Sequence, residues 1–192
     1  MIFDTVIEQN ITEHLATIEL LNSSFVASIK EFGLKLAHTL RDGGTIFWCG
    51  NGGSAADSQH LAAELVGRFK KNRRALRAIA LTTDTSNLTC IANDYSYADI
   101  FSRQVEALGR PGDALVGIST SGNSDNILNA FKVAHEMQLT TLALLGKGGG
   151  PCKEFADHCL IIPSDSTARI QEAHILIGHI LCEIIELELD LA

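Results

Sequence analysis

The chain has 192 residues, the length of one ordinary domain with room for a buried core. Apolar residues make up 46% of it and charged residues 20%, which excludes an intrinsically disordered protein. Fifteen basic and 23 acidic side chains leave a net charge of −8, so binding to nucleic acid or to an anionic membrane is not expected.

Residues 3–41 are predicted to be helical. Apolar side chains recur at helical spacing from Ile7 to Ile29, which indicates one or two amphipathic helices over residues 3–30. A further helix over 31–41 is expected to end at the Asp42-Gly43-Gly44 stop signal. The beginning of the sequence has no basic segment followed by a long apolar run, so no secretion signal is expected.

Five short apolar runs then alternate with helical patterns. The runs lie at 45–49, 77–82, 114–119, 140–145 and 159–162. The helical patterns lie near 54–67, 85–108, 123–137 and 151–157, and a final helix is expected over 167–190. This alternation predicts a single α/β domain with a doubly wound, five-stranded parallel sheet flanked by helices. Such sheets bind ligands in the loops that follow their strands.

The cysteines and the last helix bear on the compartment. The five cysteines are odd in number, form no C-x-x-C motif and lie mostly in apolar runs: Cys49, Cys90, Cys152, Cys159 and Cys182. They are predicted to be buried, reduced thiols of a cytoplasmic protein. Four acidic residues interrupt the apolar stretch from 175 to 191, which makes it too charged to span a bilayer.

The segment Gly50-Asn51-Gly52-Gly53-Ser54-Ala55 follows the first predicted strand and opens a helix. Glycines allow a tight turn and a close approach of a ligand, and a helix start offers free N–H groups. This favours a phosphate or sugar site. A tight turn without a ligand is one alternative. A dinucleotide fingerprint is another, but the acidic residue expected about 20 residues on is missing.

A second loop, Ser119-Thr120-Ser121-Gly122-Asn123-Ser124, follows the third predicted strand and opens another helix. Hydroxyl and backbone N–H groups can surround a phosphate without a basic side chain. An ordinary helix cap is the alternative, but one cap accounts for one hydroxyl and not for four. We therefore favour a phosphate site.

Two helical pairs carry acid/base and metal-binding side chains. His60 and Glu64 are four residues apart and share a helix face, while Gln171 and His179 share a broad face of the last helix. Alone, such a pair is usually a surface feature. Together they offer the nitrogen and oxygen ligands that suit a divalent metal, or an acid/base pair in a partly apolar cleft.

Three other patterns were weighed. The run from Arg68 to Arg77 holds six basic residues around Phe69, and it is predicted to be a solvated loop rather than a nucleic-acid patch. His174 is expected to be a packing histidine. A second apolar stripe on the last helix predicts burial against other subunits. Its members are Leu176, Ile180, Ile184 and Leu187.

Taken together, these segments resemble the phosphoheptose isomerase family, a branch of the sugar isomerase (SIS) fold. The resemblance spans nearly the whole chain. The matching segments are 49–54, 57–64 with Gly67-Arg68, Ala92-Asn93-Asp94, Phe101-Ser102-Arg103, 117–124, and Arg169-Ile170-Gln171-Glu172 with His174 and His179.

The resemblance implies a reaction and a setting. The reaction is the conversion of sedoheptulose 7-phosphate to D-glycero-D-manno-heptose 7-phosphate, the first step of heptose precursor biosynthesis for lipopolysaccharide. The setting is a cytoplasmic homotetramer whose subunits share active sites, with one Zn²⁺ per subunit and no nucleic-acid or membrane partner. Residues 1–42 would supply helices for oligomerisation and 43–192 the core.

Site residues follow by matching positions. Glu64 resembles the catalytic base, which also contacts substrate, and His179 its acid/base partner. The positions that match zinc ligands are His60, Glu64, Gln171 and His179. Those that match the phosphate site are Ser54, Ser119, Thr120, Ser121 and Ser124, and those that match sugar contacts are Asn51, Gly52, Gly53, Asn93, Asp94 and Gln171. Ala168 departs from members that carry an aspartate there, which puts that sugar contact in doubt.

One alternative belongs to a different class of protein. Residues 80–84, 91–94 and 169–171 also resemble a non-enzymatic SIS-domain regulator that binds the bacterial replication initiator. By that resemblance, the regulator should lack the paired glutamate and histidine. Because this chain keeps Glu64 and His179, the enzyme is favoured.

Overall fold

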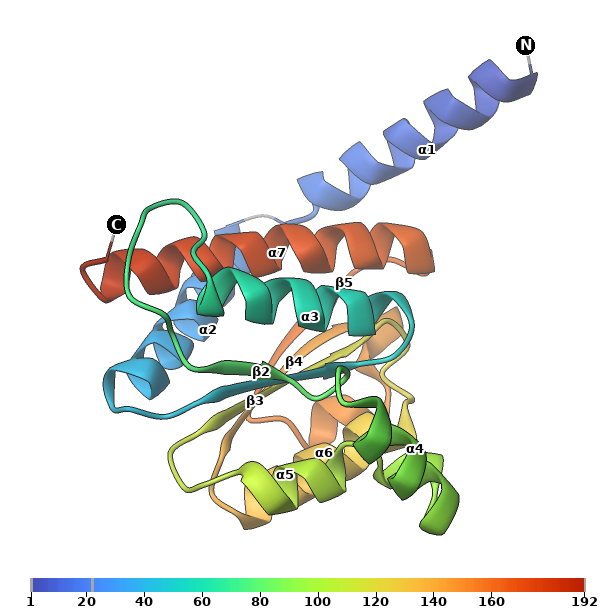
Figure 1. Cartoon of the computed structure of the whole chain (residues 1–192). Helices are drawn as coiled ribbons and strands as arrows, with labels where there is room; N and C mark the ends of the chain where they lie inside the picture. The colour runs from blue at the N-terminus through green and yellow to red at the C-terminus, as the bar shows by residue number, and fades with distance from the viewer. Residues whose placement is uncertain (1, 22, 192) are drawn as a thin grey trace.

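The computed structural model describes residues 2–21 and 23–191 and confirms the predicted α/β architecture (Figure 1). Five parallel strands form one sheet in the order β2-β1-β3-β4-β5. The strands are β1 (Ile46–Gly50), β2 (Ala78–Ala80), β3 (Ala114–Ser119), β4 (Thr140–Gly146) and β5 (His158–Ile162). The helices are α1 (Ile2–Glu19), α2 (Ser23–Arg41), α3 (Gly53–Val66), α4 (Thr85–Asp94), α5 (Ser102–Leu108), α6 (Asp125–Glu136) and α7 (Thr167–Glu188). Three short 3₁₀ turns are η1 (Tyr97–Asp99), η2 (Lys147–Gly149) and η3 (Pro151–Glu154).

Helices cover both faces of the sheet, as side chains alternating along each strand require. On β1, Trp48 points into a core formed with α2, α3 and α7, while Phe47 points into a core formed with α5 and α6. Figure 1 shows α3 and α7 above the sheet and α5 and α6 below it. Both aromatic side chains are buried, so the sheet is sealed on its two faces.

Three helix predictions were wrong in their boundaries. The amino-terminal helices divide between Glu19 and Ser23, not near residue 30. The predicted helix over 85–108 is broken into α4, η1 and α5, and 151–157 forms only the turn η3. Between α4 and η1 the apolar periodicity stops, and Ser96 donates a hydrogen bond to Asp99, a local bond that competes with helix.

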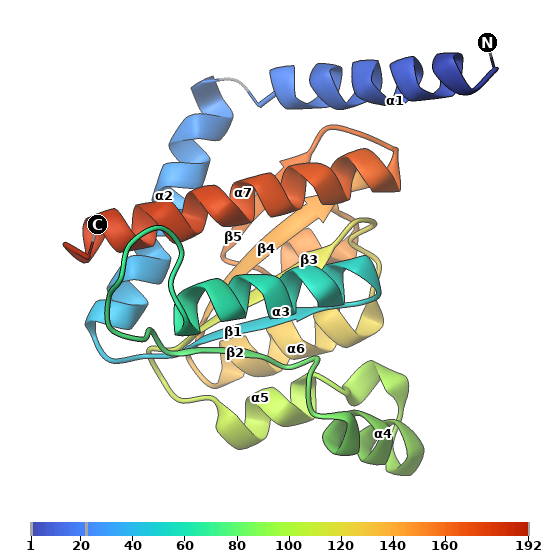
Figure 2. The ribbon, with the colours of Figure 1, turned by 45° about the horizontal axis from the view of Figure 1, so that its top comes forward.

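The two amino-terminal helices pack differently. α2 belongs to the core, because Phe32, Leu36 and Ala37 are buried against the sheet and α7. α1 projects away from the rest of the molecule (Figure 2) and buries only Thr17. It touches the start of α7 through His14, which lies 2.7 Å from Glu172. Of the two amino-terminal helices, α1 therefore forms the extension, while α2 packs as part of the core.

The strand order also fixes where ligands can bind. Because β1 lies between β2 and β3, the chain changes direction across the sheet there, and the loops after β1 and β3 meet at that point. Such a switch point is where open α/β sheets bind their ligands. Both loops singled out in the sequence, 50–55 and 119–124, are located there.

The cysteine prediction is confirmed in part. All five thiols are free, and Cys49, Cys152 and Cys182 are buried, which raises the pKa of each. Cys159 is half-buried. The prediction is wrong for Cys90, which lies exposed on α4 because that helix buries none of its residues. Among residues 2–21 and 23–191, no helix is both long and apolar enough to cross a membrane.

Candidate functional site

The loop after β1 makes a sharp turn into α3. Gly52 has φ +56° and ψ −119°, a conformation that side-chain-bearing residues rarely adopt. The Ser54 N–H donates to the Asn51 carbonyl and the Ala55 N–H to the Gly52 carbonyl. These two groups are therefore not available to a ligand. The free N–H groups predicted at this helix start are confined to the residues before Ser54.

The loop after β3 is held by its own hydroxyls. Ser119 Oγ accepts the Gly122 N–H at 3.1 Å and lies 3.1 Å from Ser124 Oγ, and Ser121 Oγ accepts the Asn123 N–H at 3.2 Å. A hydroxyl oxygen that accepts a bond keeps its proton as a donor. Ser124 is the N-cap of α6 but makes no side-chain capping bond. The capping alternative therefore does not account for its hydroxyl.

Hydrogen bonds join the loop after β1 to η1 and to the start of α6. Asn51 and Asn126 exchange side-chain amide bonds of 2.9 and 2.8 Å, and the Tyr97 hydroxyl donates to Asn51 Oδ1 at 2.9 Å. With Ser124, these three residues line a cavity of about 470 Å³. Sequence reasoning missed Tyr97 and Asn126, which lie 46 and 75 residues from Asn51, so no spacing signal could have found them.

A three-residue cluster lies on the outer surface of α3 and α7. His60 Nε2 is 3.3 Å from Glu64 Oε1 and 3.0 Å from His179 Nε2, and the three candidate ligand atoms lie within 4.8 Å of one another. Two ligands on a tetrahedral zinc ion, each about 2.1 Å from it, lie about 3.4 Å apart. The spacing and the donor types therefore fit a zinc ion.

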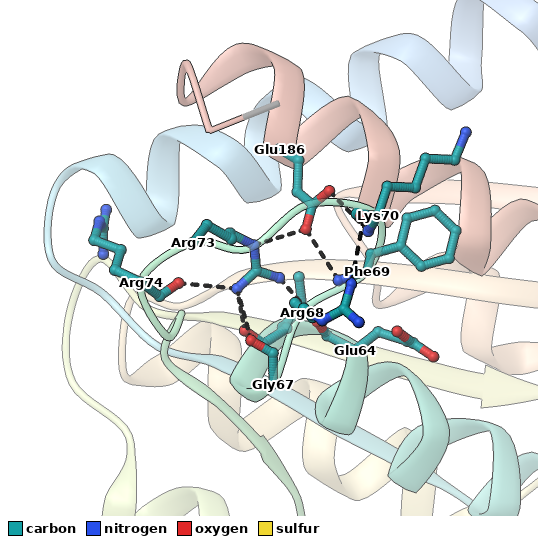
Figure 3. A network of polar contacts seen from close by, with 9 residues as sticks. Glu64, Gly67, Arg68, Phe69, Lys70, Arg73, Arg74 and Glu186 are labelled. Atoms are coloured by element: carbon teal, nitrogen blue, oxygen red, sulfur yellow. Dashed lines mark hydrogen bonds and ion pairs between the residues drawn. The ribbon is translucent and has the colours of Figure 1, made fainter.

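Phe69 packs against this cluster from the loop between α3 and β2. Its ring is stacked on the His179 imidazole, with centroids 5.5 Å apart and planes inclined by 17°. The loop is anchored to α7, because the Phe69 N–H donates to Glu186 Oε1 at 3.0 Å (Figure 3). One face of the His179 ring is therefore covered by Phe69, which lies within the basic run from Arg68 to Arg77.

The anchor is a buried ion pair between Arg73 and Glu186, with nitrogen and oxygen 2.7 Å apart and side chains 1% and 2% exposed. Arg73 also donates to the carbonyls of Glu64, Leu65 and Gly67 at the end of α3. Figure 3 shows these bonds converging on the guanidinium group. The prediction of a solvated loop is therefore wrong at Arg73, which is buried because those carbonyls and Glu186 need its donors.

Asp57 is a further ionisable group near the cluster that sequence reasoning gave no role. Burial raises the pKa of its carboxyl group, although the nearby His60 and His179 act in the opposite direction. Its Oδ2 atom is buried without a hydrogen-bond partner among the described residues. Its position three residues before His60, on the same helix face, was the available signal.

The remaining predicted residues lie apart from the cluster. The side chain of Gln171 packs against Gly53, where a Cβ atom would come within 2.6 Å of it, about 12 Å along α7 from His179. Asn93 and Asp94 are exposed at the end of α4, where Asn93 donates to Asp94. Within one chain, the structure thus brings together His60, Glu64 and His179 but not these three. His174 is confirmed as a packing residue, buried 3.0 Å from the Leu145 carbonyl oxygen.

Comparisons with known proteins agree with this architecture. The SIS domain family model matches residues 9–146. A phosphoheptose isomerase of Akkermansia muciniphila is 56% identical over 87% of this chain and 88% of its own length. One of Paramagnetospirillum magneticum is 53% identical over 97% of both. The solved structure of a phosphoheptose isomerase from Neisseria gonorrhoeae, 43% identical, covers 96% of this chain and 98% of its own with a TM-score of 0.91.

Proposed function

The chain belongs to the phosphoheptose isomerases, a branch of the SIS domain family, and from this premise we propose that it converts sedoheptulose 7-phosphate to D-glycero-D-manno-heptose 7-phosphate. This would be the first step of heptose precursor biosynthesis for lipopolysaccharide. The observation that carries the proposal is one carboxylate and two imidazoles gathered within 4.8 Å, in a fold whose switch point carries a hydroxyl-rich loop.

The proposed chemistry is a proton transfer through an enediol. Glu64 takes the proton from C1 of the ketose while His179 protonates the carbonyl oxygen at C2. His179 then removes the proton of the C1 hydroxyl as Glu64 returns its proton to C2, which yields the aldose. The chain's side chains suit these roles, because glutamate and histidine are common general acids and bases in enzymes.

The phosphate would be held without a basic side chain. Ser54, Ser119, Thr120, Ser121 and Ser124 supply hydroxyls at the two loops, and Asn51, Gly52 and Gly53 face the sugar. Asn93, Asp94 and Gln171 complete the proposed sugar contacts. A net charge of −8 does not oppose this, because net charge acts on long-range steering rather than on a local pocket.

We also propose one Zn²⁺ per subunit at His60, Glu64 and His179, with Gln171 as a fourth ligand. The three clustered residues fit that ion, whereas Gln171 would have to leave Gly53 to join them. Bound there, zinc would polarise a substrate oxygen or order the site. Glu64 has two carboxylate oxygens, of which Oε1 lies 3.3 Å from His60 Nε2, so one oxygen could hold the ion while the other moves a proton.

A cytoplasmic homotetramer with shared active sites is proposed as well. The His60 side chain is 47% exposed, so the cluster has no closed pocket around it in one chain. An apolar groove of about 510 Å³ runs between α2 and α7, lined by the predicted stripe residues Ile180, Ile184 and Leu187. α1 adds exposed apolar side chains, among them Ile7 and Ile11. A second copy would cover both surfaces and could close the site.

Incubation of the purified protein with sedoheptulose 7-phosphate, followed by NMR for the aldose product, tests the proposed function. We expect the aldose signal to appear at a rate proportional to protein concentration. No product at high protein concentration would refute isomerisation of this substrate and favour the regulator. Metal analysis before and after chelation, on the same preparation, tests the zinc proposal: loss of activity that added Zn²⁺ restores is expected, and full activity without metal would exclude a catalytic ion.

A further inference from the structure

Two side chains beside the first loop, Tyr97 and Asn126, have no part in the chemistry proposed above. Asn126 is 2% exposed near the start of α6, whereas Tyr97 is 62% exposed in η1. Both bind the same atom: Asn51 Oδ1 accepts a hydrogen bond from Asn126 Nδ2 and another from the Tyr97 hydroxyl. Two separate elements, η1 and α6, therefore converge on one side-chain amide of the loop after β1.

The bonding capacity of that amide is nearly filled. The carbonyl oxygen of Asn51 has two lone pairs, and both are occupied by these donors. Its Nδ2 carries two protons, one of which is donated to Asn126 Oδ1 at 2.9 Å. Its second N–H has no acceptor among the residues that the structure describes. In this arrangement, Asn51 can therefore offer a ligand a donor but not an acceptor.

The position of the amide indicates what it would bind. Asn51 and Tyr97 line the cavity of about 470 Å³ that also contains Ser124. On their other side lies a smaller cavity of about 130 Å³ with the apolar residues Ile100 and Phe101. Tyr97 and Asn51 thus line both cavities. The larger one also reaches Ser124 of the hydroxyl-rich loop.

We propose that Tyr97 and Asn126 are positioning residues, which hold the Asn51 amide so that its remaining N–H donates to an oxygen atom of the bound sugar phosphate. This rests on the proposed function, which places Asn51 against the substrate. A donor to an oxygen atom whose charge does not change during the reaction contributes equally to the ground state and the transition state. Its loss therefore raises KM and leaves kcat nearly unchanged.

The direct test is Tyr97→Phe, which removes one hydroxyl from an exposed ring and should not disturb folding. We expect KM for sedoheptulose 7-phosphate to rise about 3- to 10-fold, with kcat within about 2-fold of the unaltered protein. Tyr95→Phe is the matched control. Its ring stacks on Arg103, with 4.2 Å between centroid and guanidinium carbon, and the substitution keeps that ring. An unchanged KM in Tyr97→Phe, or a lower kcat at constant KM, would overturn the proposal.

A double-mutant cycle separates positioning from direct contact. If Tyr97 acts through Asn51, then Tyr97→Phe added to Asn51→Ala should change KM by less than about 2-fold. The same increase in both backgrounds would show that Tyr97 touches the substrate itself and would refute the positioning role. Asn126→Leu, which removes both bonds to Asn51 without adding a charge, should likewise raise KM and leave kcat nearly unchanged.

Binding is also measured directly, by calorimetric titration of each variant with sedoheptulose 7-phosphate. Binding without turnover in the unaltered protein would refute the proposed isomerisation. In that case, weaker binding by Tyr97→Phe than by the unaltered protein and the Tyr95→Phe control would still support the positioning role. Equal Kd values for the unaltered protein and Tyr97→Phe would refute the positioning role even if the protein is an active isomerase. Absence of binding to the unaltered protein would refute both.

Discussion

His60 and His179 lie 119 residues apart in the chain, yet their ring nitrogens are 3.0 Å apart in the fold. Glu64 joins them from one turn further along α3. Two imidazole nitrogens at this distance can share a proton or bind one metal ion. In either case the nitrogen atoms point towards a common centre between them. The chemistry at residue scale therefore depends on α3 and α7 lying side by side.

Glu64→Gln should lower kcat about 10²- to 10⁴-fold, because the amide keeps the shape of the side chain but cannot take a proton. Turnover measured by NMR, together with thermal unfolding and zinc content of the same sample, checks this. Glu106→Gln, an exposed glutamate on α5 paired with Arg103 at 3.8 Å, is the control and should leave turnover unchanged. Near-normal turnover in folded Glu64→Gln would show that Glu64 is not the base.

His174 gives a prediction about pH. Burial lowers the pKa of this fully buried imidazole to about 4, against an ordinary value of 6.5. Between those two values the unfolded chain binds a proton that the folded chain does not, so protonation favours unfolding. The contribution of His174 is therefore constant above about pH 6.5 and becomes destabilising as the pH falls towards 4, by up to about 3 kcal/mol.

His174→Gln removes this titration, because its amide cannot be protonated in that range. The free energy of unfolding of the unaltered protein should therefore fall more steeply than that of the variant between pH 6.5 and 4, as measured by urea denaturation at fixed protein concentration. Parallel curves would contradict the prediction. Carboxylates titrate in both proteins, so only the difference between the two curves reports on His174.

At the scale of elements, the loop between α3 and β2 connects the His60, Glu64 and His179 cluster to the buried core. It carries Phe69 to the face of His179 and ends α3 with the Arg73 guanidinium. Burial alone would raise the pKa of Glu186, but the Phe69 N–H, Arg73 and the Lys70 N–H outweigh it and lower that pKa. The carboxylate of Glu186 is therefore ionised in the folded protein and anchors the loop.

Breaking this pair should be costly. Arg73→Met or Glu186→Gln should each reduce the free energy of unfolding by about 3–5 kcal/mol, because one buried group is left without its partner. The double variant Arg73→Met/Glu186→Leu should recover part of the loss. The control is Lys70→Met, which breaks an exposed 2.6 Å pair with Glu183 and should cost no more than about 1 kcal/mol. Equal losses for buried and exposed pairs would refute this account.

At the scale of the whole molecule, α1 and the groove between α2 and α7 leave apolar surface uncovered in one chain. Ile2, Phe3, Ile7 and Ile11 are all more than half exposed on α1. A stable monomer rarely exposes contiguous apolar area of this kind, so we propose that further copies of the chain cover these surfaces. The proposed homotetramer would bury them.

Removal of residues 1–20 should therefore lower the molar mass of the assembly measured by light scattering, while the α/β core stays folded because α1 buries only Thr17. Ile11→Asp should act in the same direction. Glu8→Lys, a charge change at an exposed position of the same helix, should leave the mass unchanged. A truncated protein with the full assembly mass would show that α1 is not part of the interface.

Much of the fold could be predicted from the sequence, because it depends on short-range patterns. The β-branched runs, the glycine turns and the helical periodicity determine five strands in an α/β order, and that order places the loops after β1 and β3 at the switch point. The pairing of His60 with Glu64 is also local, since four residues make one helical turn. The predicted helix boundaries were wrong where a local side-chain hydrogen bond, such as that from Ser96 to Asp99, competes with the continuation of a helix.

Only the tertiary structure decided which distant groups meet. Three sets of contacts leave no regular spacing in the sequence, because each depends on how elements pack in the fold. They are the stacking of Phe69 on His179, the burial of Arg73 against Glu186, and the convergence of Tyr97 and Asn126 on Asn51. Packing is a property of whole surfaces in three dimensions, and a one-dimensional pattern records only the face a residue occupies. The sequence by itself therefore determined the scaffold and the chemical types present, and the structure decided their partners.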